Sequence, residues 1–511
     1  MVEQSNNKTI AKNTVMLYFR MFFSMLVGLF TSRVILQTLG VTDYGIYQTV
    51  GGLVGFISFL NNALSTGSSR FLTFELGRND KERLLNTFST TLFIHLGLAI
   101  FVALLAETVG LWFLYNKLVI PVERFDAAVY CYHLSVITVV VAITQVPYTS
   151  SIIAHEKMNV YAYVGILETL LRLLIVYLLY IGDFDKLMLY ATLMFVVTLG
   201  FQLFYMFYCT RHFEEVRLRF VYDKTILKEI GKFSGWSLFA NFTIALNNQG
   251  ILMLLNMFFS PAIVTARAIS LQVNGYVQQF VGNFRTAVNP QIVKRFAVGD
   301  FEGHKSLLLQ SSKFSFFMLY ILGLPVFVGA YPLLKLWLGI VPDYTVIFLQ
   351  LVVIQNLFSV FDVSLYQALY AKGDLKWNAL TSPTINFLAF PVIYICFKLG
   401  ASPVALSWAF LIVSIILGCI QKPIMLVKIV GYKWSDFIPM YLSCFKVVLI
   451  SAPLPILYYM FCSNLTGILF LDFVLTIGIA GISAGLTIWF IGLDKEMRKK
   501  LTEIAFKKLK R

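Results

Sequence analysis

Charge is scarce in this chain, and negative charge is scarcest. Its 511 residues include 26 Asp and Glu against 41 Lys and Arg, and charged residues make up 13% of the total. Soluble globular domains average about 25% charged residues, so the composition excludes an ordinary soluble domain. Hydrophobic residues make up 58% instead, which indicates a protein of the lipid bilayer.

Cysteine and histidine are also few, and neither has the spacing of a metal site. No CxxC, HExxH or P-loop pattern occurs, so the sequence predicts no metal and no cofactor. The five histidines are scattered, and a packing role is expected for the six cysteines, which lie inside or at the ends of apolar runs at positions 131, 209, 396, 419, 444 and 462.

Long apolar runs take up most of the chain. About 14 runs of roughly 20 residues can each cross about 30 Å of hydrocarbon as a helix, whereas barrel strands are about ten residues long. We therefore expect an all-α integral membrane protein. The first run carries Arg20 and Arg33, which makes it a poor cleavable signal. The expected runs are 13–37, 44–68, 84–107, 126–152, 158–181, 187–209, 233–258, 262–290, 307–334, 344–371, 377–398, 402–425, 438–461 and 468–491.

The excess of positive charge is distributed to one side. The N-terminus, the loops after even-numbered runs and the C-terminal tail carry most of the Lys and Arg residues. The opposite loops hold Lys117, Arg124, Lys186, Lys335 and Lys398. The positive-inside rule therefore places both termini in the cytoplasm and the protein in the cytoplasmic membrane. The charge is thus a topology signal, with anionic lipid headgroups rather than nucleic acid as its partner.

Two halves of the chain have the same pattern. The segments Ser69–Arg83 and Asn289–Gly303 each close an apolar run with a charged turn that contains Gly and Asp. Internal repeats in an apolar chain are typical of transporters. We expect six-helix lobes at 1–209 and 233–425, an amphipathic cytoplasmic linker at 210–232, two further transmembrane helices within 426–491 and a basic cytoplasmic tail at 492–511.

Polar and charged side chains inside a membrane run need a wet, paired or internal site. In run 262–290, four such side chains lie within about 40° of one line on a helix. They are Arg267, Asn274, Gln278 and Arg285. A lipid-facing surface would not tolerate this stripe, so we expect it to face a cavity or another helix.

Further candidate charges lie in or at the ends of three other runs. Arg20 shares a helix face with Ser24, whereas Arg33 points away from it, and Arg70 ends the second run. Asp362 is the most deeply placed acid and a candidate for ion coupling, because an acid in a low dielectric can exchange a proton. An interior with more arginine than acid attracts an anion, and the guanidinium fork suits phosphate. Asn and Gln suit a hydroxyl-rich ligand.

Several of these residues have a structural interpretation. Glu168 and Arg172 are four residues apart and can neutralise each other on one helix. Arg33 and Arg285 lie near the ends of runs and can snorkel to headgroups. Asp362 can be salt-bridged to an arginine of another helix. The sequence leaves these alternatives open.

At this point the sequence resembles a family. The motif Arg33-x-x-Leu36-x-x-Leu39-Gly40-x-x-Asp43-Tyr44-Gly45-x-Tyr47 is similar to the first-hairpin signature of bacterial polysaccharide-export flippases of the Wzx type. These flippases belong with the MATE exporters and the lipid II flippase in the MOP superfamily. Locally, Gly40 can end the first helix and Asp43 can cap the second.

The resemblance implies a MATE-like fold of two six-helix lobes plus two C-terminal helices. It implies translocation of an undecaprenyl-pyrophosphate-linked oligosaccharide by alternating access, without covalent chemistry, for O-antigen or capsule biosynthesis. Membrane lipids and other polysaccharide-assembly proteins are the expected partners. The arginines at positions 20, 33, 70, 267 and 285 would hold the pyrophosphate, and Asn274 and Gln278 the glycan. The second half lacks matching arginines at Ala240, Met253 and Pro290.

Two other classes of protein compete with the flippase. A MATE-like drug or cation exporter shares the fold but favours acids in the first lobe, where this chain has Arg20 and Arg33. A membrane glycosyltransferase or O-antigen polymerase needs a large external loop with catalytic residues. The largest external connection expected here, near 108–125, has few charged residues.

Overall fold

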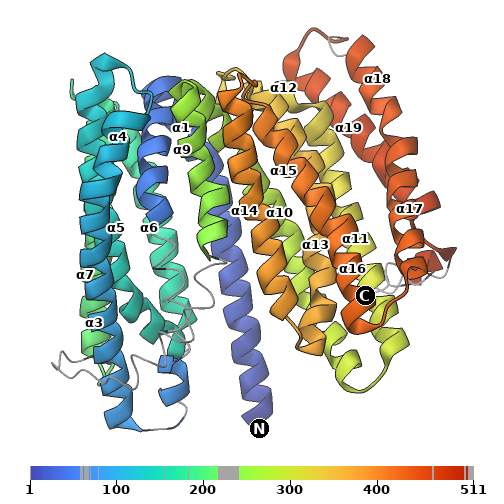
Figure 1. Ribbon diagram of the computed structural model, residues 1–511, viewed down its shortest axis with the longest axis horizontal. Helices are drawn as coiled ribbons and strands as arrows, with labels where there is room; N and C mark the ends of the chain where they lie inside the picture. Colours follow the sequence, from blue (N-terminus) through green and yellow to red (C-terminus); the bar gives the residue numbers. More distant parts are fainter. Residues whose placement is uncertain are drawn as a thin grey trace. The chain divides into compact units, whose positions relative to one another are not determined.

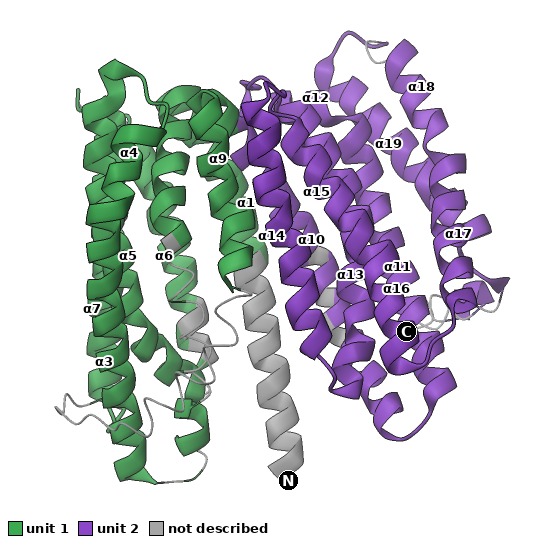
Figure 2. Cartoon of the chain, in the orientation of Figure 1, with its two compact units in different colours: residues 1–265 green, residues 266–511 purple. Residues whose placement is uncertain are grey.

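The computed structural model describes residues 2–57, 61, 68, 71–76, 78, 80–155, 157–181, 183–216, 241–462, 465–495, 497–499 and 502–503. In helix α1 the described side chains begin at Phe22. Every element in these ranges is helical (Figure 1). The chain forms two compact units, residues 1–265 and 266–511 (Figure 2). The predicted lobe and linker boundaries stay a prediction, and residues 217–240 lie outside the described part.

Unit 1 is built mainly from long helices joined by short turns. Its elements are α1 (Val2–Ile57), α3 (Lys81–Leu105), a π-helical turn (Ala106–Gly110), α4 (Leu111–Lys117), a 3-10 turn (Val122–Arg124), α5 (Phe125–Ala154), α6 (Met158–Leu178), α7 (Lys186–His212), a second π-helical turn (Leu246–Gly250) and α9 (Ile251–Phe258). The first residues of α10 also belong to it.

Unit 2 holds the remaining helices. They are α10 (Pro261–Ala297), α11 (Phe301–Val328), α12 (Ala330–Leu338), α13 (Thr345–Lys372), α14 (Lys376–Lys398), α15 (Ala405–Ile415), α16 (Lys422–Met425), α17 (Trp434–Ser451), α18 (Pro453–Cys462) and α19 (Leu469–Thr487). The turns Ile416–Gln421, Leu426–Val430 and Ile488–Gly492 are π-helical.

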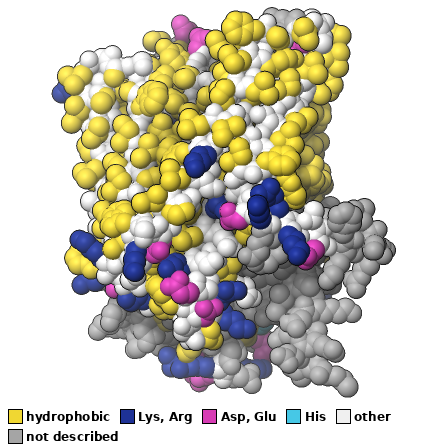
Figure 3. Space-filling model, turned by 90° about the vertical axis from the view of Figure 1, so that its right-hand side faces the viewer, with side chains coloured by type: hydrophobic (Ala, Val, Ile, Leu, Met, Phe, Trp, Pro, Cys, Tyr) yellow, Lys and Arg dark blue, Asp and Glu magenta, His cyan; other side chains and the backbone are white. Residues whose placement is uncertain are grey.

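Ten segments among the described residues are long and apolar enough to cross a membrane, from Phe22–Phe56 to Leu469–Gly492. Large apolar side chains such as Ile100, Leu104 and Leu449 are exposed on them. On the face drawn in Figure 3, hydrophobic side chains cover most of the surface, and most Lys and Arg side chains in view gather toward one end. The chain is therefore an all-α, multi-pass membrane protein, as the sequence predicts. Ten segments are consistent with about 14 spans, a number that stays a prediction.

Two helices begin in the same way at the charged turns from which the repeat is predicted. Asp80 precedes α3 and accepts a hydrogen bond from the backbone N–H of Arg83 at 3.0 Å. Asp300 precedes α11 and accepts one from the backbone N–H of Gly303 at 2.9 Å. A carboxylate at this position satisfies a free N–H of the first turn. The same residue type therefore starts corresponding helices in the two halves.

Steric requirements explain why two positions of the first-hairpin motif are glycine. Gly40 interrupts α1 with a φ of 81° and a ψ of 171°, so the helix changes direction where the sequence predicts its end. A Cβ on Gly45 would collide with the carbonyl oxygen of Pro261 at the start of α10. Thr265 fastens the same contact by donating to the carbonyl of Val41 at 2.7 Å. Glycine thus allows the start of α10 to approach the α1 turn.

The C-terminal helices α17 and α19 pack into the core of unit 2. This core is a cluster of buried apolar side chains from α10, α11, α13 and the helices that follow, among them Phe316, Phe361, Cys444, Val447, Ala480 and Ala484. Cys444 therefore has the packing role expected for it. The side chain of Lys313, 10% exposed, pairs with Asp494 at 3.3 Å just after α19. These helices are thus part of the unit rather than a loose appendage.

Candidate functional site

Two of the predicted binding residues cannot be placed. The side chain of Arg20 and the whole of Arg70 lie outside the described residues. The helix face predicted for Arg20 can still be followed at Ser24, whose hydroxyl lies 3.1 Å from that of Thr169 on α6. Arg33 is exposed on α1, one to two turns before Gly40. At Ser24, this face of α1 meets another helix of unit 1.

Arg267 is the most deeply buried of the predicted cations. It is 2% exposed, and its Nη1 donates to the hydroxyl of Ser407 on α15 at a long 3.4 Å. Its guanidinium lies 5.8 Å from the centre of the Phe348 ring, and its Nε has no hydrogen-bond partner among the described residues. No acidic side chain in that part of the chain pairs with it. Burying an arginine without an acidic partner costs free energy. A packing role alone therefore does not explain Arg267.

The polar stripe on α10 faces a neighbouring helix at its centre. The amide nitrogen of Gln278 lies 2.8 Å from Asn356 Oδ1 and 3.4 Å from Ser359 Oγ, both on α13. Asn274 Oδ1 and Arg285 Nη1 are buried without a hydrogen-bond partner in the described part of the chain. The stripe therefore combines one satisfied contact with polar atoms still able to take up a ligand.

Asp362 forms an ion pair, which is the structural alternative that the sequence left open. Its partner is a lysine instead of the expected arginine. Lys422 Nζ lies 2.8 Å from Asp362 Oδ1 on α13. The ammonium also donates to Asn378 Oδ1 and, at 3.0 Å, to Ser382 Oγ, both on α14. The ammonium thus combines one ion pair with two hydrogen bonds. The Lys422 side chain is 2% exposed, and the carboxylate is 23% exposed, so one edge of the pair is accessible.

Sequence reasoning missed the residues around this pair. Gln421 donates to Thr381 Oγ1 at 2.8 Å and to Ser382 Oγ at 3.0 Å, which ties the end of the π-helical turn to α14. Lys422 lies within the predicted run 402–425, and a lysine at that position indicates a buried polar contact. A lysine inside an apolar run should have been treated like the intramembrane arginines.

Unit 1 has an ion pair of its own, within helix α6. Arg172 Nη2 lies 2.6 Å from Glu168 Oε1, and the side chains are 46% and 33% exposed. The predicted pairing within one helix is confirmed. Arg172 also lines a pocket of about 170 Å³ within unit 1, with Tyr47, Gly51, Val54, Ser135, Thr138, Val139, Ala191, Met194 and Thr198.

A second charged cluster in unit 1 joins three helix connections. Arg124 donates to both carboxylate oxygens of Asp43, at 2.8 and 2.7 Å, and to Asp185 at 2.5 Å. Burial alone would raise the pKa of the Asp185 carboxyl, but hydrogen bonds from Arg124 and from the Met188 backbone N–H outweigh it and lower the pKa. Asp43, which the sequence predicts to cap a helix, thus makes a bidentate contact with Arg124. Through Arg124, the connections before α5 and α7 are held at the α1 turn.

Unit 2 also contains an apolar groove. It has a volume of about 290 Å³ and lies among helices α11, α13, α17 and α18. Its lining is almost wholly apolar and aromatic and includes Phe316, Leu324, Phe358, Phe445, Val448 and Ile456. Such a groove accepts hydrocarbon and offers nothing to a charged group.

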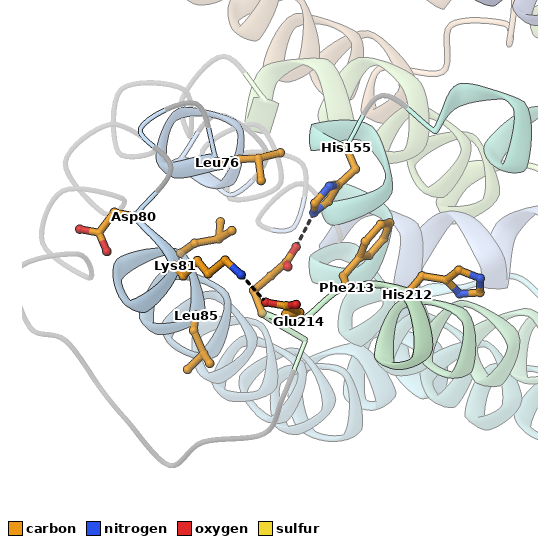
Figure 4. Close-up of a pocket in the computed structure, with 10 residues that line it drawn as sticks. Leu76, Asp80, Lys81, Leu85, His155, His212, Phe213 and Glu214 are labelled. Carbon is orange, nitrogen blue, oxygen red and sulfur yellow. Dashed lines mark hydrogen bonds and ion pairs between the residues drawn. The ribbon is translucent and has the colours of Figure 1, made fainter.

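Another pocket, of about 570 Å³, lies at the end of unit 1 that is predicted to be cytoplasmic. Figure 4 shows its two ion pairs. Lys81 Nζ lies 2.8 Å from Glu214, and His155 Nε2 lies 2.7 Å from Glu215. The His155 ring also stacks on Phe213 with centroids 4.1 Å apart. These contacts fasten the segment after α7 to the body of unit 1.

No group of three His, Cys, Asp or Glu side chains that could hold a metal ion occurs within the described ranges. Neither protein-family models nor the curated proteins give a match to this chain.

Solved structures do match it. The chain is similar to the lipid II flippase MurJ in an inward closed conformation, with a TM-score of 0.69 and 13% identity, covering 97% of this chain and 100% of that one. It is similar to an inward-facing multidrug resistance MATE family transporter of the MOP superfamily, with a TM-score of 0.65 and 14% identity, covering 85% and 99%. A MOP superfamily transporter from Pyrococcus furiosus gives a TM-score of 0.56 at 12% identity, covering 86% and 97%. The chain has the fold of the MOP-superfamily transporters.

Proposed function

We propose that this protein is a flippase that moves an undecaprenyl-pyrophosphate-linked oligosaccharide across the cytoplasmic membrane by alternating access. The observation that carries the proposal is that unit 2 combines buried cationic groups with an apolar groove. Arg267 has no acidic partner among the described residues, and the groove is lined almost wholly by apolar side chains. An anionic head attached to a hydrocarbon chain is the class of substrate that needs both.

The arginines favour a pyrophosphate as the anionic part. A guanidinium gives two parallel hydrogen bonds to paired oxygens, which an ammonium cannot do. Arg267 and Arg285 each have a buried nitrogen without a partner in the described part of the chain. In the proposed mechanism, these two arginines and Arg20, Arg33 and Arg70 each bind the pyrophosphate at some stage of transport. Asn274 and Gln278 then bind the glycan.

The Asp362–Lys422 pair supports a role in coupling. A carboxylate within a membrane helix can exchange a proton as access to it changes during transport. The accessible edge of Asp362, 23% exposed, gives that proton a path. We therefore propose proton or cation coupling through this pair. Unchanged pH dependence of transport in an Asp362→Asn variant would remove it from the mechanism.

We further propose that the protein works in the cytoplasmic membrane with both termini in the cytoplasm. Its product would feed surface polysaccharide assembly, such as O-antigen or capsule, beside other assembly proteins. The support is the one-sided distribution of Lys and Arg, together with the first-hairpin motif.

Gene deletion tests the proposed function. We expect lipid-linked repeat units to accumulate on the cytoplasmic face, surface glycan to disappear, and a plasmid copy to restore it. Normal surface glycan in a deletion strain without a paralogue contradicts the proposal.

A MATE-like multidrug or cation exporter is the alternative, favoured by the fold and by the acids Glu168 and Asp362. It predicts drug hypersensitivity of the deletion strain with surface glycan intact. A glycosyltransferase or polymerase is less well supported, because Arg124 of the external connection is already held by Asp43 and Asp185.

A further inference from the structure

The Arg172 pocket of unit 1 has the chemistry of a sugar-binding site. An ion pair between neighbouring turns of one helix does not tie that helix to any other. Within the described part of the chain, the Arg172 guanidinium hydrogen-bonds to Glu168 alone. The side chain remains 46% exposed inside a membrane-spanning unit. Helix packing therefore does not account for this charged pair, whose arginine lines the pocket.

The pocket wall supplies hydrogen-bond acceptors to complement the arginine. Ser135 and Thr138 on α5 donate to the carbonyls of Cys131 and Leu134, each at 2.7 Å, and Thr198 on α7 donates to that of Met194 at 2.9 Å. Because each hydroxyl hydrogen is engaged within its own helix, the oxygen lone pairs are left to accept from a ligand.

Shape and charge narrow the class of ligand. The volume of about 170 Å³ would hold about five water molecules, so one sugar ring would fill it. Tyr47, whose ring packs edge-on against Tyr190 at 4.8 Å, adds an aromatic surface. Glu168 neutralises the guanidinium and orients it. The site therefore offers hydrogen bonds without net charge, which suits neutral hydroxyls better than pyrophosphate.

We propose that this pocket is a subsite for one neutral sugar ring of the transported glycan, with Arg172 as the donor and Ser135, Thr138 and Thr198 as acceptors. Glu168 is a positioning residue. The proposal rests on the proposed function, which supplies the glycan. It adds a sugar subsite in unit 1 to the glycan contacts proposed for Asn274 and Gln278.

Gly51 offers a way to block the subsite. It lines the pocket, and within the described residues a Cβ at Gly51 would meet no atom within 4 Å. Gly51→Leu should therefore fill the space without a clash. Gly97→Leu on α3 is the matched control, because Gly97 is exposed, also has open space and lies outside the pocket. Arg172→Gln removes the donor fork while keeping a polar side chain.

The test uses two probes on the purified full-length protein in nanodiscs. One is the oligosaccharide released by mild acid from the source strain's lipid-linked precursor, and the other is farnesyl pyrophosphate. We expect Gly51→Leu and Arg172→Gln to weaken oligosaccharide binding at least tenfold, with farnesyl pyrophosphate binding and thermal stability unchanged. Gly97→Leu should match the wild type with both probes.

Two results would overturn the subsite and leave the proposed function standing. One is equal oligosaccharide binding by the wild type and both pocket variants. The other is farnesyl pyrophosphate binding by the wild type without oligosaccharide binding. Failure of the wild type to bind either probe, with normal surface glycan in the deletion strain, would instead refute the proposed function itself.

Discussion

Among the described residues, each unit contains an ion pair that joins a carboxylate to a buried or half-buried cation, and the two pairs are built differently. In unit 1, Glu168 and Arg172 are on the same helix and are one-third to one-half exposed. In unit 2, Asp362 and Lys422 are on different helices, and the lysine is 2% exposed. The first pair can be broken without disturbing packing, whereas the second fixes α13 and α14 to the segment around α16. The two units thus begin α3 and α11 in the same way, whereas their ion pairs serve different purposes.

The largest expected effect is on stability, from breaking the buried pair of unit 2. Lys422→Met should destabilise the protein by about 3–5 kcal/mol, because it leaves a partly buried carboxylate without its partner. The double variant Lys422→Met with Asp362→Asn should recover most of that loss, because the unpaired charge is then gone. Thermal unfolding in one detergent measures both. A single variant as stable as the wild type would contradict the structural role of the pair.

Arg267 sharpens the comparison, because it is as buried as Lys422 but has no acidic partner in the described part of the chain. Replacing an unpaired buried charge by an apolar side chain is neutral or stabilising, so Arg267→Met should unfold at the wild-type temperature or above. Export of surface glycan should nevertheless fall at least tenfold. Arg267→Lys should also be impaired, because lysine lacks the bidentate fork. Loss of stability together with normal export would instead mark Arg267 as a structural residue.

The charged cluster at Arg124 gives a smaller, pH-dependent effect. The pKa of Asp185 is lowered in the folded protein from its ordinary 3.8, so its contribution is complete above that value and is lost as the pH falls below it. Asp185→Asn should lower stability near neutral pH by about 1 kcal/mol, since the pair is partly exposed. It should also flatten the loss of stability as the pH falls below about 4. An unchanged acid limb of the stability curve would contradict the role of this cluster.

The features that sequence could predict are those set by neighbours along the chain. The starts of α3 and α11 follow from Asp80 and Asp300, and the kink in α1 follows from Gly40. The Glu168–Arg172 pair follows from its spacing.

Features that depend on which helices pack together could not be predicted. The partnership of Asp362 with Lys422 needs the packing of α13 beside α16, which no local pattern reports. For the same reason Arg267 could be assigned to a polar face of α10, but its near-complete burial could not be foreseen. Helical periodicity indicates which face is polar without indicating what covers that face.

The smallest expected stability effect comes from the pair of unit 1. An exposed pair four residues apart on a helix contributes about 0.3–0.5 kcal/mol, so Glu168→Gln should barely change the unfolding temperature. Glutamine keeps a hydrogen-bond acceptor but leaves Arg172 with its full charge, and the pocket should then prefer an anion to a neutral sugar. Thermal unfolding and oligosaccharide binding, measured on the same preparation, separate the two roles. A large drop in the unfolding temperature would show that this pair also holds the helices of its unit together, and the contrast with Asp362–Lys422 would no longer hold.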